Sequence, residues 1–356
     1  PHVPPASSRR APSESIAVPE LTGASSSLLL RPGGGRPRRA RQRYLPFPAA
    51  CLVNGEVLPF NLYRGTEHAP LQVFLGAGEP LRQDVISTIR RDASRTRLYI
   101  REEERESSLV FQERVLRQAL ADGEVRVDEK CQLLRGLLGA LSKEVFENAR
   151  QLTVYRQHEI ASRTVDFVLE EPSSLRELLS PPHREYDPCS HSVNVAIYTL
   201  AIARQVLGLQ GRQNLREIVA ATALHDIGKS LVRQEILEKP EALDEAEWAE
   251  MKRHSGYGYN LLRRENMATE ETSIILLQHH ERPDGGGYPL GLAGDQIHPY
   301  ARICAVADAY DALTTDRSFQ PAHTPFDALR VMRRNMCAQF DPDVYRAFVL
   351  VMKRRE

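Results

Sequence analysis

The fold of the C-terminal half is decided by the stretch LREIVAATALHDIG, residues 215–228. Its apolar residues recur every three or four positions, which is the period of an amphipathic helix. The run ends in His225 and Asp226, two polar side chains beside apolar neighbours. From Asp187 onward, further segments have the same period and are joined by short loops marked by Gly and Pro. The sequence therefore predicts an all-α domain over residues 187–356.

The first half of the chain is organised differently. Residues 1–48 are rich in Pro, Ser, Gly and Arg and cannot bury enough apolar surface, so we expect a disordered tail. Residues 49–122 mix strand-like and helical segments, with a hairpin turn expected at Asn54-Gly55, and predict a small α/β domain with a regulatory or dimer-forming role. Residues 123–186 have helical spacing and predict a helical linker. The predicted fold class is α+β overall.

The bulk composition argues against several classes of partner. The 47 basic and 47 acidic residues cancel, which gives no argument for DNA, RNA or an anionic membrane. The longest apolar runs are far too short to span a bilayer. The five cysteines are widely spaced and form no C-x-x-C motif, so a disulfide framework is not expected and a cytoplasmic location is predicted. The Arg-rich segment 31–43 is interpreted as a solvated tail.

Seven polar residues of the helical half stand out by their context. A lone histidine on an apolar face is usually a core residue, but here five accompany two carboxylates in apolar runs: His191, His225, His254, His279, His280, Asp226 and Asp308. Burying unpaired carboxylates is costly, and a divalent cation would neutralise them. Mixed imidazoles and carboxylates suit Fe, Mn or Zn, and the set exceeds what one tetrahedral zinc ion takes. We expect two metal ions, Fe or Mn ahead of Zn, sharing a bridging carboxylate.

Lys229 is a separate candidate. It follows Asp226 by three positions, so on a continuous helix it would share the face of His225 and Asp226 and could contact a phosphate or leaving oxygen. The string HDIGKS is not a P-loop, because that motif needs a glycine at the position of Ala223. A surface lysine at a helix end is the competing interpretation.

Together these residues resemble the HD-GYP family, a branch of the HD phosphohydrolase superfamily. The resemblance covers residues 187–356 through the motifs DPCSH at 187, HDIGK at 225, KRH at 252, HHERPDGGGYP at 279 and VADAYDALTTDR at 306. It implies an HD-type catalytic domain that hydrolyses the bacterial second messenger cyclic di-GMP to linear pGpG, which some members process further to GMP.

The resemblance also implies roles for individual residues. One metal ion would be surrounded by His191, His225, Asp226 and Asp308. Asp226 would bridge to a second ion, which is completed by His254, His279 and His280. Lys229 would position the phosphate or assist the leaving group, and Arg317 would hold a substrate phosphate, as suits a guanidinium.

The glycine loop and one aspartate extend this set. In the family the loop lies beside the active site and takes part in substrate access and partner contact, which makes Gly287 and Tyr288 candidates here. Asp187 stands where some members carry a glutamate that binds a third metal ion. Because Pro188 follows it, Asp187 also has the pattern of a helix N-cap, and both roles stay open. Gln320 replaces a basic residue that the family often has, so one phosphate contact is expected to be weaker.

Three functions are compatible with the sequence. The first is a metal-dependent cyclic di-GMP phosphodiesterase with Asp226 and Lys229 as catalytic residues. The second is a module that acts chiefly by binding a signalling protein through the glycine loop. The third is a related HD phosphohydrolase with another nucleotide or cyclic dinucleotide as substrate. A homodimer, the metal identity and the input signal are left open by the sequence.

Overall fold

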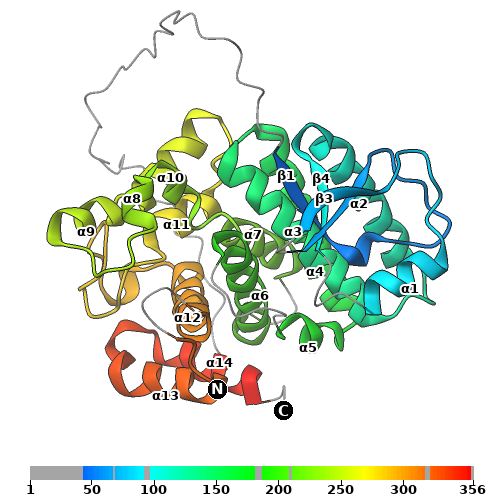
Figure 1. Cartoon of the computed structure of the whole chain (residues 1–356). Coiled ribbons are helices and arrows are strands. Elements are labelled where there is room, and N and C mark those ends of the chain that lie inside the picture. The colour runs from blue at the N-terminus through cyan, green and yellow to red at the C-terminus, as the bar shows by residue number, and fades with distance from the viewer. Residues whose placement is uncertain are drawn as a thin grey trace, which may run out of the picture. The chain divides into compact units, whose positions relative to one another are not determined.

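The computed structural model describes residues 43–66, 69–91, 97–180, 187–207, 211–316 and 321–353 (Figure 1). Its strands lie in the first part of the chain, and the later part is mostly helical. The predicted fold class, α+β with a helical C-terminal domain, is confirmed. The predicted disordered tail lies outside the described residues, apart from residues 43–48.

A four-stranded antiparallel sheet opens the described chain. Its strands are β1(Tyr44–Phe47), β2(Leu62–Thr66), β3(Ala69–Leu75) and β4(Arg97–Arg101), in the order β1-β4-β2-β3. Strand β1 lies within residues 1–48, which were expected to be disordered. The predicted end of the tail at residue 48 is therefore wrong, because ordered structure begins before it. The reason is local: Phe47 is buried and its ring lies 5.5 Å from that of Phe60, while Tyr44 pairs with Arg101 of β4.

The expected hairpin at Asn54-Gly55 is also wrong. Gly55 does adopt a positive φ of 83°, as a tight turn requires. However, the chain before it forms the 3-10 helix η1(Ala49–Cys51), and Val57 pairs with Pro80 instead. Leu52 and Leu58 explain this outcome, because both are fully buried in the core rather than placed on two facing strands.

Helices complete the first part of the chain. The helix α1(Gln83–Arg91) was expected, and after β4 the chain enters η2(Glu102–Glu104) and α2(Arg105–Ala121). The predicted linker region holds α3(Val127–Glu147), α4(Gln151–Glu170) and α5(Ser174–Leu178). One continuous cluster of buried apolar residues extends from Phe47 to Met352. The domain boundaries at 122 and 186 therefore stay predictions, and the hydrophobic core continues across both.

The C-terminal half is a succession of helices built around one of them. The central helix is α6(Pro188–Leu207), in which every residue from His191 to Ala203 is buried. It contacts α3 and three other helices, α7(Arg212–Thr222), α12(Pro299–Thr314) and α14(Pro342–Lys353). A helix that is apolar on all sides must be enclosed in this way. The remaining elements are η4(Ile227–Leu231), α8(Gln234–Leu237), α9(Glu245–Lys252), α10(His254–Arg264), α11(Glu270–Gln278), η5(Gly294–Gln296), α13(Pro325–Asn335) and η6(Cys337–Gln339).

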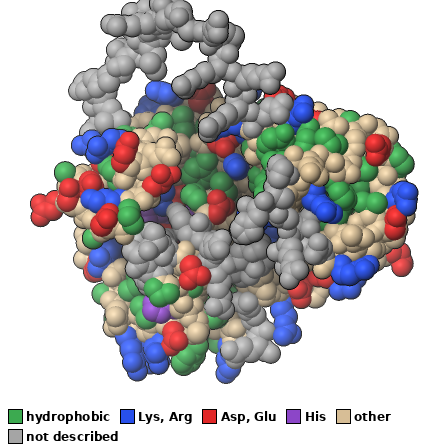
Figure 2. All heavy atoms as spheres, in the orientation of Figure 1, with side chains coloured by type: hydrophobic (Ala, Val, Ile, Leu, Met, Phe, Trp, Pro, Cys, Tyr) green, Lys and Arg blue, Asp and Glu red, His purple; other side chains and the backbone are tan. Residues whose placement is uncertain are grey.

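Charged side chains are intermixed on the surface. On the face drawn in Figure 2, basic and acidic side chains of the described residues alternate rather than forming separate fields. This distribution agrees with the equal totals of 47 basic and 47 acidic residues. None of the described helices combines the length and the apolar character needed to cross a membrane.

Three aromatic rings join α6, α12 and α14, and this contact gives a stability prediction. The ring of Phe348 lies 6.0 Å from that of Tyr198 and 4.8 Å from that of Tyr310, and Phe348 is fully buried. Phe348→Ala should lower the free energy of unfolding by about 3–5 kcal/mol, through lost burial and the cavity left behind. The exposed Phe326 provides the control, since Phe326→Ala should change it by no more than about 0.5 kcal/mol. Urea denaturation measures both, and equal effects would contradict this packing.

Candidate metal centre

The seven predicted ligands come from separate elements and meet in one place. His191 lies in the first turn of α6, and Asp308 lies within α12. His254 begins α10, and the pair His279 and His280 follows α11 directly. Helix ends and turns thus carry most of the set, because they can direct side chains toward a common point. The two remaining residues, His225 and Asp226, occupy the turns between α7 and η4.

The placement of Lys229 differs from the continuous helix considered for it. The helix α7 ends at Thr222, and Lys229 lies in the 3-10 helix η4. The expectation that Lys229 shares a helical face with His225 and Asp226 is therefore wrong. The chain nevertheless turns back so that the Lys229 ammonium forms an ion pair with Asp226 Oδ2.

Gly228 allows this turn to pack closely, and the sequence analysis did not single it out. A Cβ at Gly228 would lie 1.9 Å from the His254 carbonyl oxygen and 2.5 Å from the Gly258 backbone nitrogen. Both atoms belong to the backbone of α10, so no side-chain rotation could relieve the overlap. Glycine here lets the turn that bears Asp226 lie directly against the start of the helix that bears His254.

Asp226 is the common element of two groups of ligand atoms. The first group is His191, His225 and Asp226, and the second is Asp226, His254, His279 and His280. Within each group the donor atoms lie within 4.8 Å of one another. Donors bound to one ion at about 2.0–2.2 Å stand roughly 3–3.5 Å apart, and the 3.3 Å between His254 Nε2 and His279 Nε2 falls in this range.

The two oxygens of Asp226 face different histidines. Oδ2 lies 3.3 Å from His225 Nε2 and 3.6 Å from His191 Nε2. Oδ1 lies 3.4 Å from His254 Nε2 and 4.0 Å from His279 Nε2. A carboxylate in this position can bridge two cations, one on each oxygen. This geometry is compatible with the bridging carboxylate expected from the sequence, and the bridging role itself stays a prediction.

Asp308 also faces both groups. Its Oδ1 lies 3.2 Å from His191 Nε2, but Asp308 belongs to neither group of ligand atoms, and its place beside the first ion stays a prediction. Its Oδ2 lies 3.9 Å from Nδ1 of His280, on the side of the second group. The carboxylate of Asp308 therefore spans the centre, a feature that the sequence did not indicate.

Backbone carbonyls orient three of the imidazoles. The Nδ1 atoms of His225, His254 and His279 lie 2.9, 2.8 and 2.7 Å from the carbonyl oxygens of Thr222, Met251 and Ile275. Because a carbonyl oxygen only accepts, each Nδ1 must carry the proton and donate it. The Nε2 lone pair of each ring is then directed at the centre, as metal-binding histidines require.

His191 is oriented by a carboxylate that the sequence analysis missed. Its Nδ1 lies 2.7 Å from Oδ2 of Asp311, a fully buried residue one helical turn after Asp308. Thr315 donates a further hydrogen bond of 3.4 Å to the same oxygen. The spacing of Asp308 and Asp311 on one face of a predicted helix was the available signal.

Burial and neighbouring charges set the proton affinities of the metal-free centre. Burial lowers the pKa of His254 to about 4, and burial with the neighbouring imidazoles lowers that of His279 to about 3. For His191, burial is outweighed by Asp308 and Asp311, and the pKa rises to about 10. Burial opposes ionisation of Asp226, but Lys229 and the nearby histidines hold the pKa of its carboxyl well below the usual range. Without a metal ion, the centre thus combines neutral imidazoles at His254 and His279 with a protonated His191 and an ionised Asp226.

These residues fit a divalent metal ion. Nε2 of His225 and Oδ1 of Asp226 are buried and accept no hydrogen bond from any described residue. Buried acceptors are normally satisfied, so two of them aimed at one point indicate a missing cation. The donor set of imidazole nitrogens and carboxylate oxygens suits Fe, Mn or Zn. The His/Asp cluster can therefore hold metal, while the ligand role of each residue stays a prediction.

The glycine loop folds back onto the histidine pair. The Tyr288 backbone nitrogen donates to the carbonyl oxygen of His280 over 3.2 Å, and the two rings lie 4.7 Å apart. Gly285 has a φ of 77°, which favours glycine. A Cβ at Gly287 would lie 2.5–2.7 Å from backbone atoms of residues 280–282. The loop is thus closed over the pair by its glycines, and Tyr288 covers one side of His280.

Glu281 anchors the same loop and was also missed. It is buried, and its Oε1 accepts hydrogen bonds from the backbone nitrogens of Leu290 and Gly291 at 2.6 and 3.1 Å. Its Oε2 accepts another from Leu292 at 2.8 Å. One carboxylate next to His280 thereby satisfies three backbone donors beyond Tyr288. The glutamate between the histidine pair and the glycines was the signal in the sequence.

Two other candidates have different outcomes. Asp187 is exposed, and its Oδ2 accepts a hydrogen bond of 2.8 Å from the Ser190 backbone nitrogen, which confirms the N-cap of α6. It belongs to neither group of ligand atoms found among the described residues. Its binding of a third ion stays a prediction. Arg317 and Gln320 lie outside the described residues.

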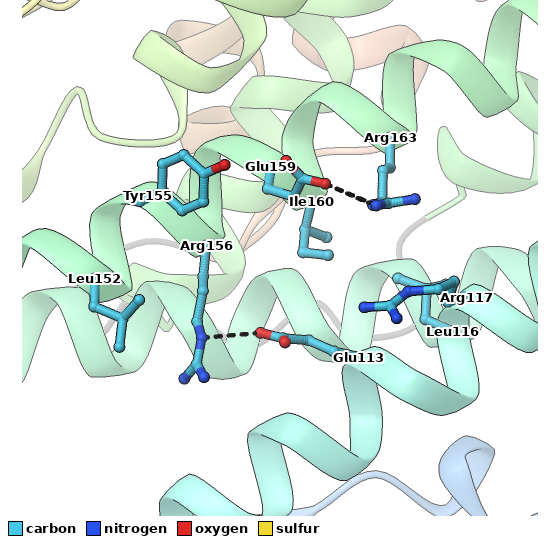
Figure 3. Close-up of a pocket in the computed structure, with 9 residues that line it drawn as sticks. All are labelled: Glu113, Leu116, Arg117, Leu152, Tyr155, Arg156, Glu159, Ile160 and Arg163. Atoms are coloured by element: carbon cyan, nitrogen blue, oxygen red, sulfur yellow. Dashed lines mark hydrogen bonds and ion pairs between the residues drawn. The ribbon is translucent and has the colours of Figure 1, made fainter.

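A shallow cleft of about 260 Å³ lies elsewhere, between α2 and α4 (Figure 3). Four of its charged residues form two ion pairs: Arg156 contacts Glu113, and Arg163 contacts Glu159. None of the predicted site residues lines it. The cleft therefore adds nothing to the metal centre.

Comparison with known proteins agrees with this geometry. Residues 176–344 match the model of the HD domain family. A cyclic di-GMP phosphodiesterase of Pseudomonas aeruginosa is 40% identical over 182 residues, which cover 51% of this chain and 43% of that protein. A 3'3'-cGAMP-specific phosphodiesterase of Vibrio cholerae is 40% identical over 159 residues, which cover 44% of this chain and 34% of that protein. The matches thus span less than half the length of these curated relatives.

A solved structure agrees in fold over a longer part of the chain. An HDG"Y"P protein from Bdellovibrio bacteriovorus superposes with a TM-score of 0.66, covering 87% of this chain and all of that one, at 19% identity. Residues 176–344 are therefore similar in sequence to HD domains, and the chain shares the fold of the Bdellovibrio protein. The curated relatives that match this part of the chain include cyclic dinucleotide phosphodiesterases.

The contact between Asp311 and His191 gives the first prediction for the centre. Asp311→Ala removes the acceptor that fixes the proton on Nδ1 of His191, so metal affinity should fall by about 10–100-fold. Asp311→Asn keeps an acceptor oxygen and should lose less. Competition with a chelating indicator measures both affinities. Unchanged affinity in the alanine variant would show that Asp311 does not orient His191.

The glycine loop gives the second prediction. Gly287→Ala places a methyl group against backbone atoms and should lower the free energy of unfolding by about 1–3 kcal/mol, with weaker metal binding. Gly286→Ala is the matched control, because its nearest neighbour is a side-chain oxygen of Asp284 at 3.1 Å, which can move. Thermal unfolding and metal content compare the two variants. Equal losses would contradict the close approach at Gly287.

Proposed function

We propose that this protein is a metal-dependent phosphodiesterase that hydrolyses cyclic di-GMP to linear pGpG, with GMP as a further product to be tested. The observation that carries the proposal is Asp226, whose two oxygens face separate histidine groups inside an HD domain. The similarity to a cyclic di-GMP phosphodiesterase supports the substrate class.

Two divalent ions, Fe or Mn ahead of Zn, would occupy the centre. The first would be held by His191, His225, Asp226 and Asp308, and the second by Asp226, His254, His279 and His280. When bound, such ions lower the pKa of a water molecule and offset the charge of a phosphoryl group. The chain contributes by fixing the proton on Nδ1 of the three carbonyl-bonded histidines and by keeping Asp226 ionised.

The substrate would approach from the side of the cluster that solvent reaches. The side chains of His191, His225, Asp226, His254 and His279 are at most 3% exposed. Those of Lys229, Asp308 and His280 are 20, 17 and 24% exposed. A phosphodiester placed there would meet the Lys229 ammonium, which could stabilise charge on a phosphoryl or leaving oxygen. We propose the same role for Arg317, and Gly287 and Tyr288 as the edge of the substrate site.

A second candidate substrate has its own support. The relative from Vibrio cholerae is specific for 3'3'-cGAMP and is as similar in sequence as the cyclic di-GMP enzyme. The two dinucleotides differ in one base and share the phosphodiester ring, so the metal centre does not discriminate between them. The proposal that the glycine loop also binds a signalling protein, and that the chain forms a homodimer, rests on the family resemblance.

Turnover of a cyclic dinucleotide panel tests the proposal. Manganese- or iron-loaded protein should linearise cyclic di-GMP faster than 3'3'-cGAMP, as measured by chromatography of the products. Asp226→Ala should abolish turnover, and Lys229→Ala should lower kcat by roughly 10²–10³-fold, as loss of an electrostatic contact to the reacting group does. The exposed Asp343 supplies the control, since Asp343→Ala should be fully active. Activity that survives Asp226→Ala would refute the proposed chemistry.

A further inference from the structure

A cleft of about 470 Å³ opens where β1, β4, α2, α3 and the first turn of α6 meet. Its walls include Leu45, Phe47, Ile100 and Leu109, and its floor is a furrow on α3. That furrow consists of Gly136, Gly139 and Ala140. A Cβ at Gly139 would meet nothing within 4 Å, whereas one at Gly136 would lie 3.2 Å from the Cβ of Pro48. None of the seven predicted metal ligands lines the cleft. Its volume falls in the range of small-molecule sites, about 300–1,000 Å³.

One buried polar group of the cleft lacks a partner. The Gln112 residue is only 4% exposed, and its Nε2 donates to Ser108 Oγ over 3.0 Å. The other end of the amide, Oε1, has no hydrogen-bond partner among the described residues. Because buried acceptors are nearly always satisfied, this oxygen indicates a donor that a ligand supplies. An apolar cleft with an orphan acceptor suits an amphipathic molecule that carries a hydroxyl or amide group.

Charged groups of both signs line the cleft: Arg105, Arg135 and Lys143 against Glu144 and the exposed Asp187. Arg105 is held by Glu144 and Glu147, and Arg135 donates to Asn194 of α6. Lys143 also lines the cleft, and no hydrogen bond or ion pair joins it to another described residue. Lys143 lies near Cys189, whose pKa burial and the charge of Asp187 raise to about 12, against a smaller lowering effect of Lys143. Lys143 is therefore the cation that a carboxylate can meet.

The two polar groups that a ligand would contact, Lys143 and Gln112, lie at a distance from each other along the helices. Arg105 of α2 pairs with Glu144 of α3, which places the start of α2 beside Lys143. Gln112 follows Arg105 by seven residues, which corresponds to about 10 Å along a helix. A ligand that reaches both would carry its polar groups at opposite ends of an apolar chain of this length.

We propose that this cleft is a binding site for a medium-chain carboxylate with a hydroxyl group at its far end. The hydrocarbon chain would lie on the furrow of α3, the carboxylate would meet Lys143, and the hydroxyl would donate to Gln112 Oε1. The occupant would also touch Asp187, Cys189 and Ser190, directly before His191. The site is therefore placed to stabilise the start of the helix that carries a predicted metal ligand.

Calorimetric titration of the full chain with 10-hydroxydecanoate, below its micelle concentration, tests the site. One equivalent should bind, and decanoate should bind about tenfold more weakly because it lacks the hydroxyl. Gly139→Leu fills the furrow and should abolish binding. Gly123→Leu is the matched control, because its Cβ would also meet nothing within 4 Å but lies outside the cleft. Absence of saturable binding to the wild-type chain, or full binding to Gly139→Leu, would overturn the proposal.

Two further variants test the contacts with Lys143 and with Gln112 one at a time. Lys143→Gln should weaken both ligands about tenfold, whereas Lys353→Gln at the other end of the chain should bind as the wild type does. Gln112→Met keeps the shape of the side chain and should bind both ligands equally. Hydrogen exchange should become slower in residues 188–194 when the site is saturated. If Gln112→Met still bound 10-hydroxydecanoate more tightly than decanoate, the contact with Gln112 would be contradicted. Unchanged hydrogen exchange in residues 188–194 at saturation would contradict the contact with the start of α6.

Discussion

The burial of the Asp226 carboxylate determines how the elements around the metal centre are arranged. A carboxylate that is 3% exposed cannot remain ionised without compensation, because transfer of a charge from water into the interior is costly. One ion pair, from Lys229, reaches its Oδ2. The histidines on both sides of the carboxylate supply the remaining compensation. His191 carries a positive charge in the metal-free centre, and the other rings direct lone pairs to places where cations could bind. The apolar helices around Asp226 exclude water, so an uncompensated charge on this carboxylate would be especially costly.

Both the packing of distant helices and short-range side-chain contacts hold the histidines and Asp226 in place. The enclosed helix α6 fixes His191 relative to α12, and Asp311 then fixes the ring of that histidine. Gly228 allows the turn of Asp226 to lie against α10. Glu281 satisfies the backbone of the loop that closes over His280. Each of these residues would act on a predicted ligand without binding a cation itself, which is how outer contacts commonly tune a metal site.

The sequence predicted the helical domain and the composition of the centre because both depend on local patterns. Helical periodicity identified most segments, and polar residues inside apolar runs pointed to side chains that the structure brings together. The errors concern contacts between distant segments. Strand β1 exists because Phe47 packs on Phe60, and Val57 pairs with Pro80 rather than across the Asn54-Gly55 turn. The end of α7 at Thr222 and the second face of Asp308 likewise depend on tertiary structure. No local pattern encodes such contacts.

The most direct measurement of the central claim is the number of metal ions per chain, determined by elemental analysis of anaerobically prepared protein. If Asp226 joins two groups of ligands, the wild-type chain should hold two ions and Asp226→Asn should lose both. His225→Ala should retain the ion of the second group, because its partners Asp226, His254, His279 and His280 are untouched. A single ion in the wild-type chain, or two ions in Asp226→Asn, would contradict a centre built around this carboxylate.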